Sequence, residues 1–201
     1  TIRKNKLRTF LTAFSVMWGV FMLVLLLGVS TGLQNGVVHS FSDNAINSSW
    51  VYSGRTSMAY KGLKPGRQIQ FKTEDFENVR DAVDGIEYAT ARYMVWSAEV
   101  AYGDEYSTYP LRAVNPDHQF LENSLIKKGR FLNPTDLLEN RKVAVIGKEI
   151  VDDLFPDVNP LGEYLRVYGI PFKVVGVFED TGNSRAQRYI YIPLSSGQNV
   201  F

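Results

Sequence analysis

The longest apolar pattern in the chain lies close to its N-terminus. No Asp, Glu, Lys or Arg occurs between Arg8 and Asp43, and residues 11–29 read LTAFSVMWGVFMLVLLLGV. Nineteen residues in a helix extend about 28 Å, close to the ~30 Å thickness of the hydrocarbon core of a bilayer. The run is longer than the core of a signal peptide, and no A-x-A cleavage pattern comes after it. We therefore expect residues 11–33 to form a transmembrane helix.

After residue 40 the pattern changes to short segments with periods of two or of 3.6 residues. Alternating β-branched and aromatic residues predict strands at 49–53, 86–102, 106–114, 141–146, 164–168, 172–178 and 189–192. Helices are expected at 73–83 and 148–155, a short helix after residue 115, and a loop at 54–66. Many predicted strands are neighbours in the sequence and should pair locally. The expected fold class is therefore α+β rather than a doubly wound sheet.

Individual side chains carry further expectations. Thr73 is expected to cap the helix that it begins, and one face of that helix carries Phe76, Val79, Ala82 and Val83. The inward side of the helix at 148–155 should consist of Ile150, Val151, Leu154 and Phe155. Trp50 and Trp96 should pack in the core, although an exposed tryptophan at an interface is an alternative.

The charges are distributed unevenly along the chain. Residues 1–42 carry four basic residues and no acid, whereas residues 43–201 carry 18 basic and 21 acidic residues, a net of −3. The four basic residues are Arg3, Lys4, Lys6 and Arg8. By the positive-inside rule they place residues 1–10 in the cytoplasm and residues 34–201 outside it. The overall net charge of +1 argues against a nucleic-acid-binding protein.

Glycines recur every fourth residue at the end of the apolar run, at Gly28, Gly32 and Gly36. In an apolar helix this spacing places them on one face, where a second helix could approach closely. The alternative is that the helix ends near Gly32.

The segment 143–162 reads VAVIGKEIVDDLFPDVNPLG and resembles the strand, glycine and helix of a phosphate-binding loop. Both nucleotide-binding fingerprints need further glycines, but only Gly147 precedes the predicted helix. We expect Gly147 to be structural, because a side chain would crowd this turn or require an unfavourable φ. Two isolated histidines, His39 and His118, and the absence of cysteine argue against a metal site. No catalytic residues and no cofactor are predicted.

Three motifs carry a resemblance to a known family. They are NKLRTFLT at 5–12, then KGRFLNPTD at 128–136 with RKVAVIGKEIVDDLFPDVNPLGEYLRV at 141–167, and finally FKVVGVFED at 172–180 with YIYIPL at 189–194. Together they resemble the MacB/FtsX-type ABC transporter permeases. The motif positions that we expect to be structural are Gly129, Arg130, Gly147, Pro160, Gly162 and Gly176.

The resemblance implies a transmembrane helix followed by a periplasmic core domain in a bacterial inner membrane. It implies a porter-like subdomain with an inserted Sabre-like part within about 96–168. It also implies a longer permease with four transmembrane helices and an ABC ATPase as a partner subunit or fused domain. A second permease copy, membrane lipid, and a periplasmic adaptor with an outer-membrane protein would be the other partners. The expected function is export of periplasmic substrates, driven by movement of the outer domain.

The sequence leaves other functions open. Relatives within the same superfamily release lipoproteins or regulate cell-wall hydrolases. A membrane-anchored sensor would differ in the segment after Phe201, because a permease continues with three more apolar helices. A tethered periplasmic enzyme would need clustered nucleophiles, bases or metal ligands, which the sequence does not offer.

Overall fold

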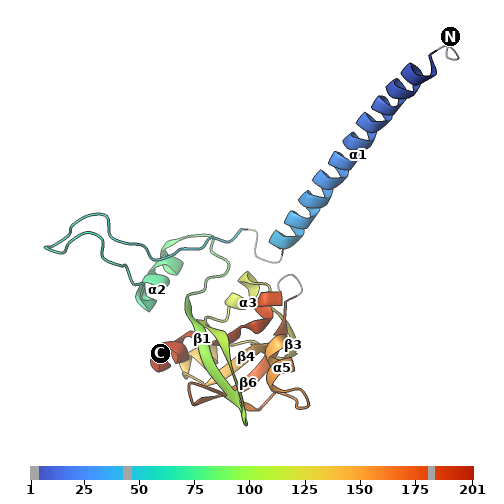
Figure 1. The fold of residues 1–201 in the computed structure, drawn as a ribbon. Coiled ribbons are helices and arrows are strands. Elements are labelled where there is room, and N and C mark those ends of the chain that lie inside the picture. Colours follow the sequence, from blue (N-terminus) through green and yellow to red (C-terminus); the bar gives the residue numbers. More distant parts are fainter. Residues whose placement is uncertain (1–4, 43–46, 181–183) are drawn as a thin grey trace. The chain divides into compact units, whose positions relative to one another are not determined.

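The computed structural model of the protein describes residues 5–42, 47–180 and 184–201. The chain divides into two units, Thr1–Asp43 and Asn44–Phe201. The first unit is one helix, and the second contains all the strands (Figure 1).

Helix α1 spans Lys6–Ser42 and is the first unit's only element among the described residues. Within it, Lys6–Gln34 is long and apolar enough to cross a membrane, and none of that window is buried within the protein. The few hydroxyl groups turn back to the helix: Ser15 donates to the Leu11 carbonyl at 2.8 Å and Thr31 to the Leu27 carbonyl at 2.7 Å. These bonds satisfy polar groups that lipid could not satisfy. The long apolar helix predicted at 11–33 is confirmed, and it extends further at both ends.

The second unit is built around a closed barrel. Its strands are β1 (Arg92–Tyr102), β2 (Glu105–Val114), β3 (Leu125–Gly129), β4 (Val143–Gly147), β5 (Tyr164–Val167), β6 (Ile170–Glu179) and β7 (Ile190–Pro193). The strand order is β3-β6-β4-β7-β2-β1-β5, and β5 also pairs with β6. This last pairing closes six strands into a barrel and leaves β3 outside it, against β6. Closure removes the free edges that an open sheet would expose.

The barrel is mixed in direction. The pairs β2–β7 and β4–β6 are parallel, whereas β1–β2, β1–β5, β4–β7, β3–β6 and β5–β6 are antiparallel. The predicted hairpin of β5 and β6 is present, with Val167 opposite Ile170. The mixture of local hairpins and crossover pairs confirms a mixed α and β fold.

Short helices surround the barrel. They are α3 (His118–Leu121), α4 (Pro134–Leu138), α5 (Lys148–Leu154), α6 (Leu194–Val200) and the 3₁₀ helix η2 (Ser184–Arg188). In α5, Ile150 and Leu154 are buried and so is Phe155 just after it, as predicted, while Val151 is half-buried.

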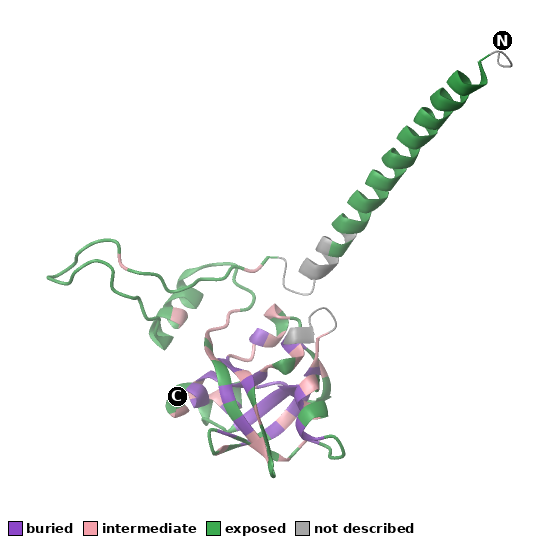
Figure 2. Ribbon diagram, viewed as in Figure 1, coloured by how far each residue is buried: buried purple, intermediate pink, exposed green. Residues whose placement is uncertain are grey.

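Strand β4 explains why the VAVIG run is continuously apolar. All five of its residues are buried. Ala144 and Ile146 belong to the large apolar cluster, and Val143 and Val145 belong to a second cluster with Phe178. A strand that is covered on both faces needs apolar residues at every position. Figure 2 shows this concentration of buried residues in the barrel.

Residues 47–88 are organised differently. They contain helix α2 (Thr73–Ala82) and a long loop that two isolated bridges close, Arg55 with Gln68 and Tyr60 with Leu63. Almost all of this segment is exposed (Figure 2). None of the ten residues of α2, all of them described, is buried.

Several predictions for this segment are wrong. Residues 49–53 form no strand, because alternation alone provides no partner for their backbone groups. The strand predicted at 86–102 begins only at Arg92. Lys72, not Thr73, is the N-cap of α2, and its N–H donates to the Asp75 carboxylate at 2.8 Å.

Both tryptophans predicted for the core are exposed. Trp50 is 39% exposed and Trp96 is 76% exposed. Further along the same strand Ala98 and Val100 are buried, and a strict period of two would place Trp96 on their side. The pairing of β1 with β2 shifts its register between Val95 and Ala98, and this irregularity interrupts the alternation at Trp96.

The sequence analysis also missed four elements, β3, α4, η2 and α6. Strand β3 has the sequence LIKKG and no buried residue, as is typical of a strand outside a barrel. The predicted inserted part at about 96–168 stays a prediction, and strands from inside that range pair with β6 and β7 outside it.

Candidate functional site

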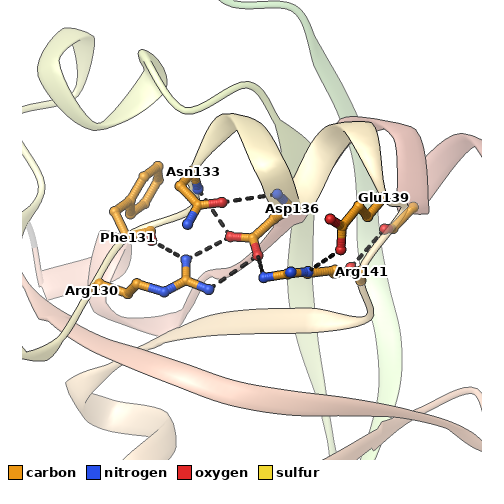
Figure 3. A network of polar contacts seen from close by, with 7 residues as sticks. Arg130, Phe131, Asn133, Asp136, Glu139 and Arg141 are labelled. Carbon is orange, nitrogen blue, oxygen red and sulfur yellow. Dashed lines mark hydrogen bonds and ion pairs between the residues drawn. The ribbon is translucent and has the colours of Figure 1, made fainter.

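The motif residues at 129–141 form a network of polar contacts around a buried carboxylate (Figure 3). Arg130 donates to Asp136 through both terminal nitrogens, with Nη1–Oδ2 at 2.6 Å and Nη2–Oδ1 at 3.0 Å. Asp136 has 0% exposure, whereas the Arg130 side chain is 41% exposed. A two-pronged pair of this kind fixes the orientation of both groups. Arg141 adds a second positive charge, with its Nη1 3.7 Å from Oδ1.

Asp136 also holds the start of α4. The Asn133 N–H donates to the Asp136 Oδ2 at 3.0 Å, and the Asn133 side-chain oxygen accepts from the Asp136 N–H at 2.9 Å. Pro134 follows at the first turn. This reciprocal capping satisfies amides that the helix itself leaves unpaired. The carboxylate is therefore fully engaged with the protein, and we regard the network as a structural one.

Two glycines allow the chain segments beside this network to approach closely. Gly129 has a φ of +74°, and a Cβ there would overlap the Val175 carbonyl. A Cβ at Gly176 would overlap the Arg130 carbonyl. The two glycines and Arg130 therefore lie where the backbones of the paired strands β3 and β6 approach most closely.

Gly147, at the end of β4, is also in close contact with a neighbouring backbone segment. Its φ is −74°, which any residue can adopt. A Cβ, however, would overlap the backbone carbonyl of Gln187, in η2. A larger residue at position 147 is thus excluded by lack of space and not by the backbone conformation. Of the other motif positions, Pro160 is buried and Gly162 lies in an exposed turn with a φ of +92°.

The residues predicted for the membrane region lie in the first unit. Gly28, Gly32 and Gly36 are exposed on α1, with open space at each Cβ position in the described part of the chain. Lys6 and Arg8 are exposed in its first turns. Arg3 and Lys4 lie outside the described residues. The packing role of the glycines and the topology therefore stay predictions.

A second polar cluster, which the sequence analysis missed, joins β1, β2 and α3. Glu122 accepts from Arg112 Nη1 at 2.7 Å and from Arg92 Nη1 at 3.2 Å. His118 is completely buried, with Nε2 3.8 Å from Glu122. We call Arg92, Arg112, His118 and Glu122 the arginine–glutamate cluster. One signal could have indicated it, since Arg112 interrupts the apolar strand sequence LRAV.

The electrostatics of this cluster keep His118 neutral. Burial, and then the charges of Arg112 and Arg92, lower the pKa of His118 to about 3. Glu122 is close, but its charge is already shared by two guanidinium groups. Burial also raises the pKa of the neighbouring Tyr191. Neither ring can exchange a proton easily near neutral pH, so the cluster is a poor acid–base centre.

The remaining surface offers no reaction centre among the described residues. No group of three or more His, Cys, Asp or Glu side chains there could hold a metal ion. One open depression on the barrel has no charged side chain in its lining, which consists of Tyr93, Val95, Tyr168, Ile170, Val200 and Phe201. A catalytic pocket would bring several polar groups together, and this one does not.

These features define a barrel domain that follows a long apolar helix and carries partly buried ion pairs. The chain matches the family model of the MacB-like periplasmic core domain over residues 9–201 and therefore belongs to that family. The resemblance to the permeases is thus confirmed.

Relatives and solved structures agree with this assignment. The chain is 23% identical over 200 residues to the macrolide export ATP-binding/permease protein MacB of Campylobacter fetus subsp. fetus, covering 98% of this chain and 30% of that protein. It is 27% identical over 184 residues to MacB of Rhodospirillum rubrum, covering 90% of this chain and 27% of that protein. The chain thus spans less than a third of the length of these relatives.

Two solved structures share the fold. The periplasmic region of MacB from Actinobacillus actinomycetemcomitans has a TM-score of 0.59 at 23% identity, over 68% of this chain and 61% of that one. The extracellular domain of the noncanonic ABC-type transporter YknZ from Gram-positive bacteria has a TM-score of 0.58 at 24% identity, over 65% and 66%.

Proposed function

We propose that this chain is the first transmembrane helix and outer domain of an ABC transporter permease that exports substrates from the outer side of the membrane. The observation that carries the proposal is the family match, which runs from the apolar helix to the end of the barrel without a break. ATP hydrolysis takes place in a partner subunit or in a domain outside this chain. The outer domain moves in response.

The structure supports a mechanical role in two ways. The barrel is closed, and partly buried ion pairs and close backbone contacts at glycines hold it together, so it can move as a rigid body. Its described titratable clusters are engaged in internal pairs rather than directed at a ligand. Such a domain can transmit force but has little means of catalysis.

The proposed assembly contains a second permease copy, which would contact α1 along Gly28, Gly32 and Gly36. Membrane lipid surrounds the apolar helix, and the outer domain would engage a periplasmic adaptor and, through it, an outer-membrane protein. The proposed location is the bacterial inner membrane, with the barrel in the periplasm.

Within the outer domain we propose a division different from the predicted one. The barrel as a whole, from Arg92 to Pro193, would be the inserted Sabre-like part, and residues 47–88 would belong to the porter-like part. The support is that the barrel closes on itself, whereas residues 47–88 bury almost nothing. Limited proteolysis should then cut first between residues 54 and 88 and leave the barrel intact. First cuts within 115–165 would contradict this division.

The decisive test of the function is the gene product as a whole. The complete protein should contain three more apolar helices and should purify with an ABC ATPase, either fused or as a subunit. In a bacterium that lacks its own efflux pumps, the complex should raise resistance to a macrolide, the substrate named for the MacB relatives. A variant with an inactive ATPase should not. A single further helix followed by a kinase domain would overturn the proposal.

The proposed topology can be tested directly, because the sequence contains no cysteine. Lys6→Cys should be protected from a membrane-impermeant thiol reagent in intact cells, and Asn47→Cys should react. Labelling at position 6 with protection at position 47 would reverse the topology and contradict the outward location of the barrel.

A further inference from the structure

Trp50 lies shortly after the end of α1 in the sequence. Seven residues, 43–49, separate it from Ser42 at the end of α1. The eight chain steps from Ser42 to Trp50 can extend at most about 29 Å. Any residue here that is held by the barrel therefore limits how far the barrel can move relative to the helix.

Trp50 is held by two side chains of the arginine–glutamate cluster. The Arg92 guanidinium lies over its ring, 4.7 Å from the centroid. The ring of His118 meets it edge to face, with centroids 6.5 Å apart at 80°. The negative face of an aromatic ring attracts a cation, and tryptophan is the best partner for such a contact.

The side chains behind Trp50 are themselves fixed. Glu122 joins Arg92 to Arg112, and the Arg112 guanidinium lies 3.7 Å from the centroid of the Tyr189 ring. His118 packs edge to face against Tyr191 at 5.3 Å. Trp50 is therefore connected through β1, β2 and α3 to β7, in the wall of the barrel.

Among the described residues, the next hydrogen bond and ring contact that join this segment to the rest of the outer domain involve Thr73 and Tyr88. Gln198 donates to the Thr73 hydroxyl at 3.1 Å, and Tyr88 stacks on Phe120 with centroids 4.7 Å apart. The loop between them and Trp50 closes on itself, since the Ile69 N–H donates to the Gly54 carbonyl at 2.9 Å. Without a hold at Trp50, a displacement of α1 would be absorbed by the chain between Trp50 and Thr73 before it reached the barrel.

We propose that Trp50, held by Arg92 and His118, is the clasp through which movement of the first membrane helix reaches the barrel. This inference rests on the proposed function, because a clasp needs a movement to transmit. The ring face of Trp50 is the essential feature, since it accepts the cation of Arg92. An apolar side chain of similar size would fill the position without that attraction.

The local contact can be tested first, in the complete chain. Trp18→Phe and Trp96→Phe leave Trp50 as the only tryptophan. Arg92→Met should then increase the quenching of Trp50 fluorescence by acrylamide about twofold, because the cation no longer covers the ring. Arg80→Met, which alters an exposed pair in α2, is the control and should leave it unchanged. Equal quenching in all three proteins would overturn the clasp.

The mechanical role needs the assembled transporter. Tyr106 is 84% exposed on the barrel, so Tyr106→Cys can carry a spin label in each of two copies. In the otherwise unchanged protein, the distance between labels should differ between ATP-bound and nucleotide-free states. Trp50→Leu should abolish most of this difference while ATP hydrolysis continues. Trp50→Phe should preserve it, and so should the neighbouring control Val51→Ala, where the side chain is 77% exposed.

The outcomes separate the two proposals. If the unchanged protein shows no nucleotide-dependent distance, the proposed function fails and the clasp fails with it. If the unchanged protein and Trp50→Leu show the same change, only the clasp is overturned. Thermal unfolding of each variant should stay within a few degrees of the unchanged protein, which excludes a general loss of folding.

Discussion

The barrel and the preceding segment, residues 47–88, contain similar apolar side chains but bury them very differently. In the barrel, Ile146, Phe172 and Ile192 have 0% exposure. In the segment, Met58, Phe71 and Val79 are 78%, 55% and 56% exposed. The amphipathic pattern is present in both regions. A pattern predicts which side chains can be buried, whereas topology decides whether anything covers them.

Substitution of one glycine in each region should give the largest difference in stability between the barrel and residues 47–88. Gly147→Val should destabilise the outer domain by at least about 4 kcal/mol, because the new side chain would overlap the Gln187 backbone in η2. Gly54→Ala, in the exposed segment, should change stability by less than about 0.5 kcal/mol, since a Cβ there meets no described atom within 4 Å. Urea unfolding of the chain in detergent micelles measures both. A mild effect at Gly147 would show that η2 can move away.

Truncation of apolar side chains should give the next largest contrast. Ile146→Ala removes a fully buried side chain from β4, the strand between β6 and β7, and should cost about 3 kcal/mol. Val79→Ala on α2 should cost less than about 0.5 kcal/mol. The same urea titration decides between them. Equal losses at the two positions would mean that the segment has a core of its own in solution.

The sequence predicted the central parts of this fold for reasons that the structure makes clear. Strand β4 and helix α5 are detectable because their burial pattern is strong and local. Strand β3 escaped detection because its two lysines and exposed positions resemble a loop. A strand outside a barrel needs only one partner, so its sequence carries little periodic signal.

The two polar clusters also differ in how far apart their residues lie in the sequence, and therefore in how well the sequence predicts them. The motif around Gly129 and Arg130 could be recognised because its members lie close together in the sequence. The arginine–glutamate cluster joins Arg92 to Glu122, 30 residues apart, and Trp50 is further away still. Only the closure of β1 on β2 and the position of α3 bring these groups together. No pattern of spacing could have predicted that Trp50 lies over Arg92.

Charge pairs should show a smaller contrast between the two regions than apolar side chains do. Asp136→Ala should cost about 2–3 kcal/mol, because it leaves Arg130 without its buried partner and removes one of the two capping hydrogen bonds of α4, the one from the Asn133 N–H. The half-exposed position of Arg130 keeps the value below that of a fully buried pair. Asp81→Ala, which breaks the exposed pair with Arg80, should cost no more than about 0.5 kcal/mol. If the two costs are equal in the urea titration, the motif network does not stabilise the barrel.

The smallest expected effect concerns pH and again distinguishes the barrel from the segment, which contains no histidine. The pKa of His118 is lowered to about 3 from 6.5, first by burial and then by Arg112 and Arg92. Below pH 6.5 the unfolded chain therefore binds a proton that the folded barrel excludes, so stability falls as the pH falls. Between about pH 7.5 and about pH 5.5 the loss should be about 1.4 kcal/mol, and it should continue toward about pH 3.

A variant isolates this contribution from other titrations. Neither ring nitrogen of His118 has a hydrogen-bond partner among the described residues, so His118→Leu removes the titration without leaving a polar group unpaired. Its urea midpoint should change much less between about pH 7.5 and about pH 5.5, a window that lies above the usual pKa range of carboxylates. Glu122 could disturb this result, because it lies 3.8 Å from His118 Nε2 and could support a protonated ring. A stability that stays constant on acidification in the unchanged protein would show that Glu122 outweighs burial and the two arginines.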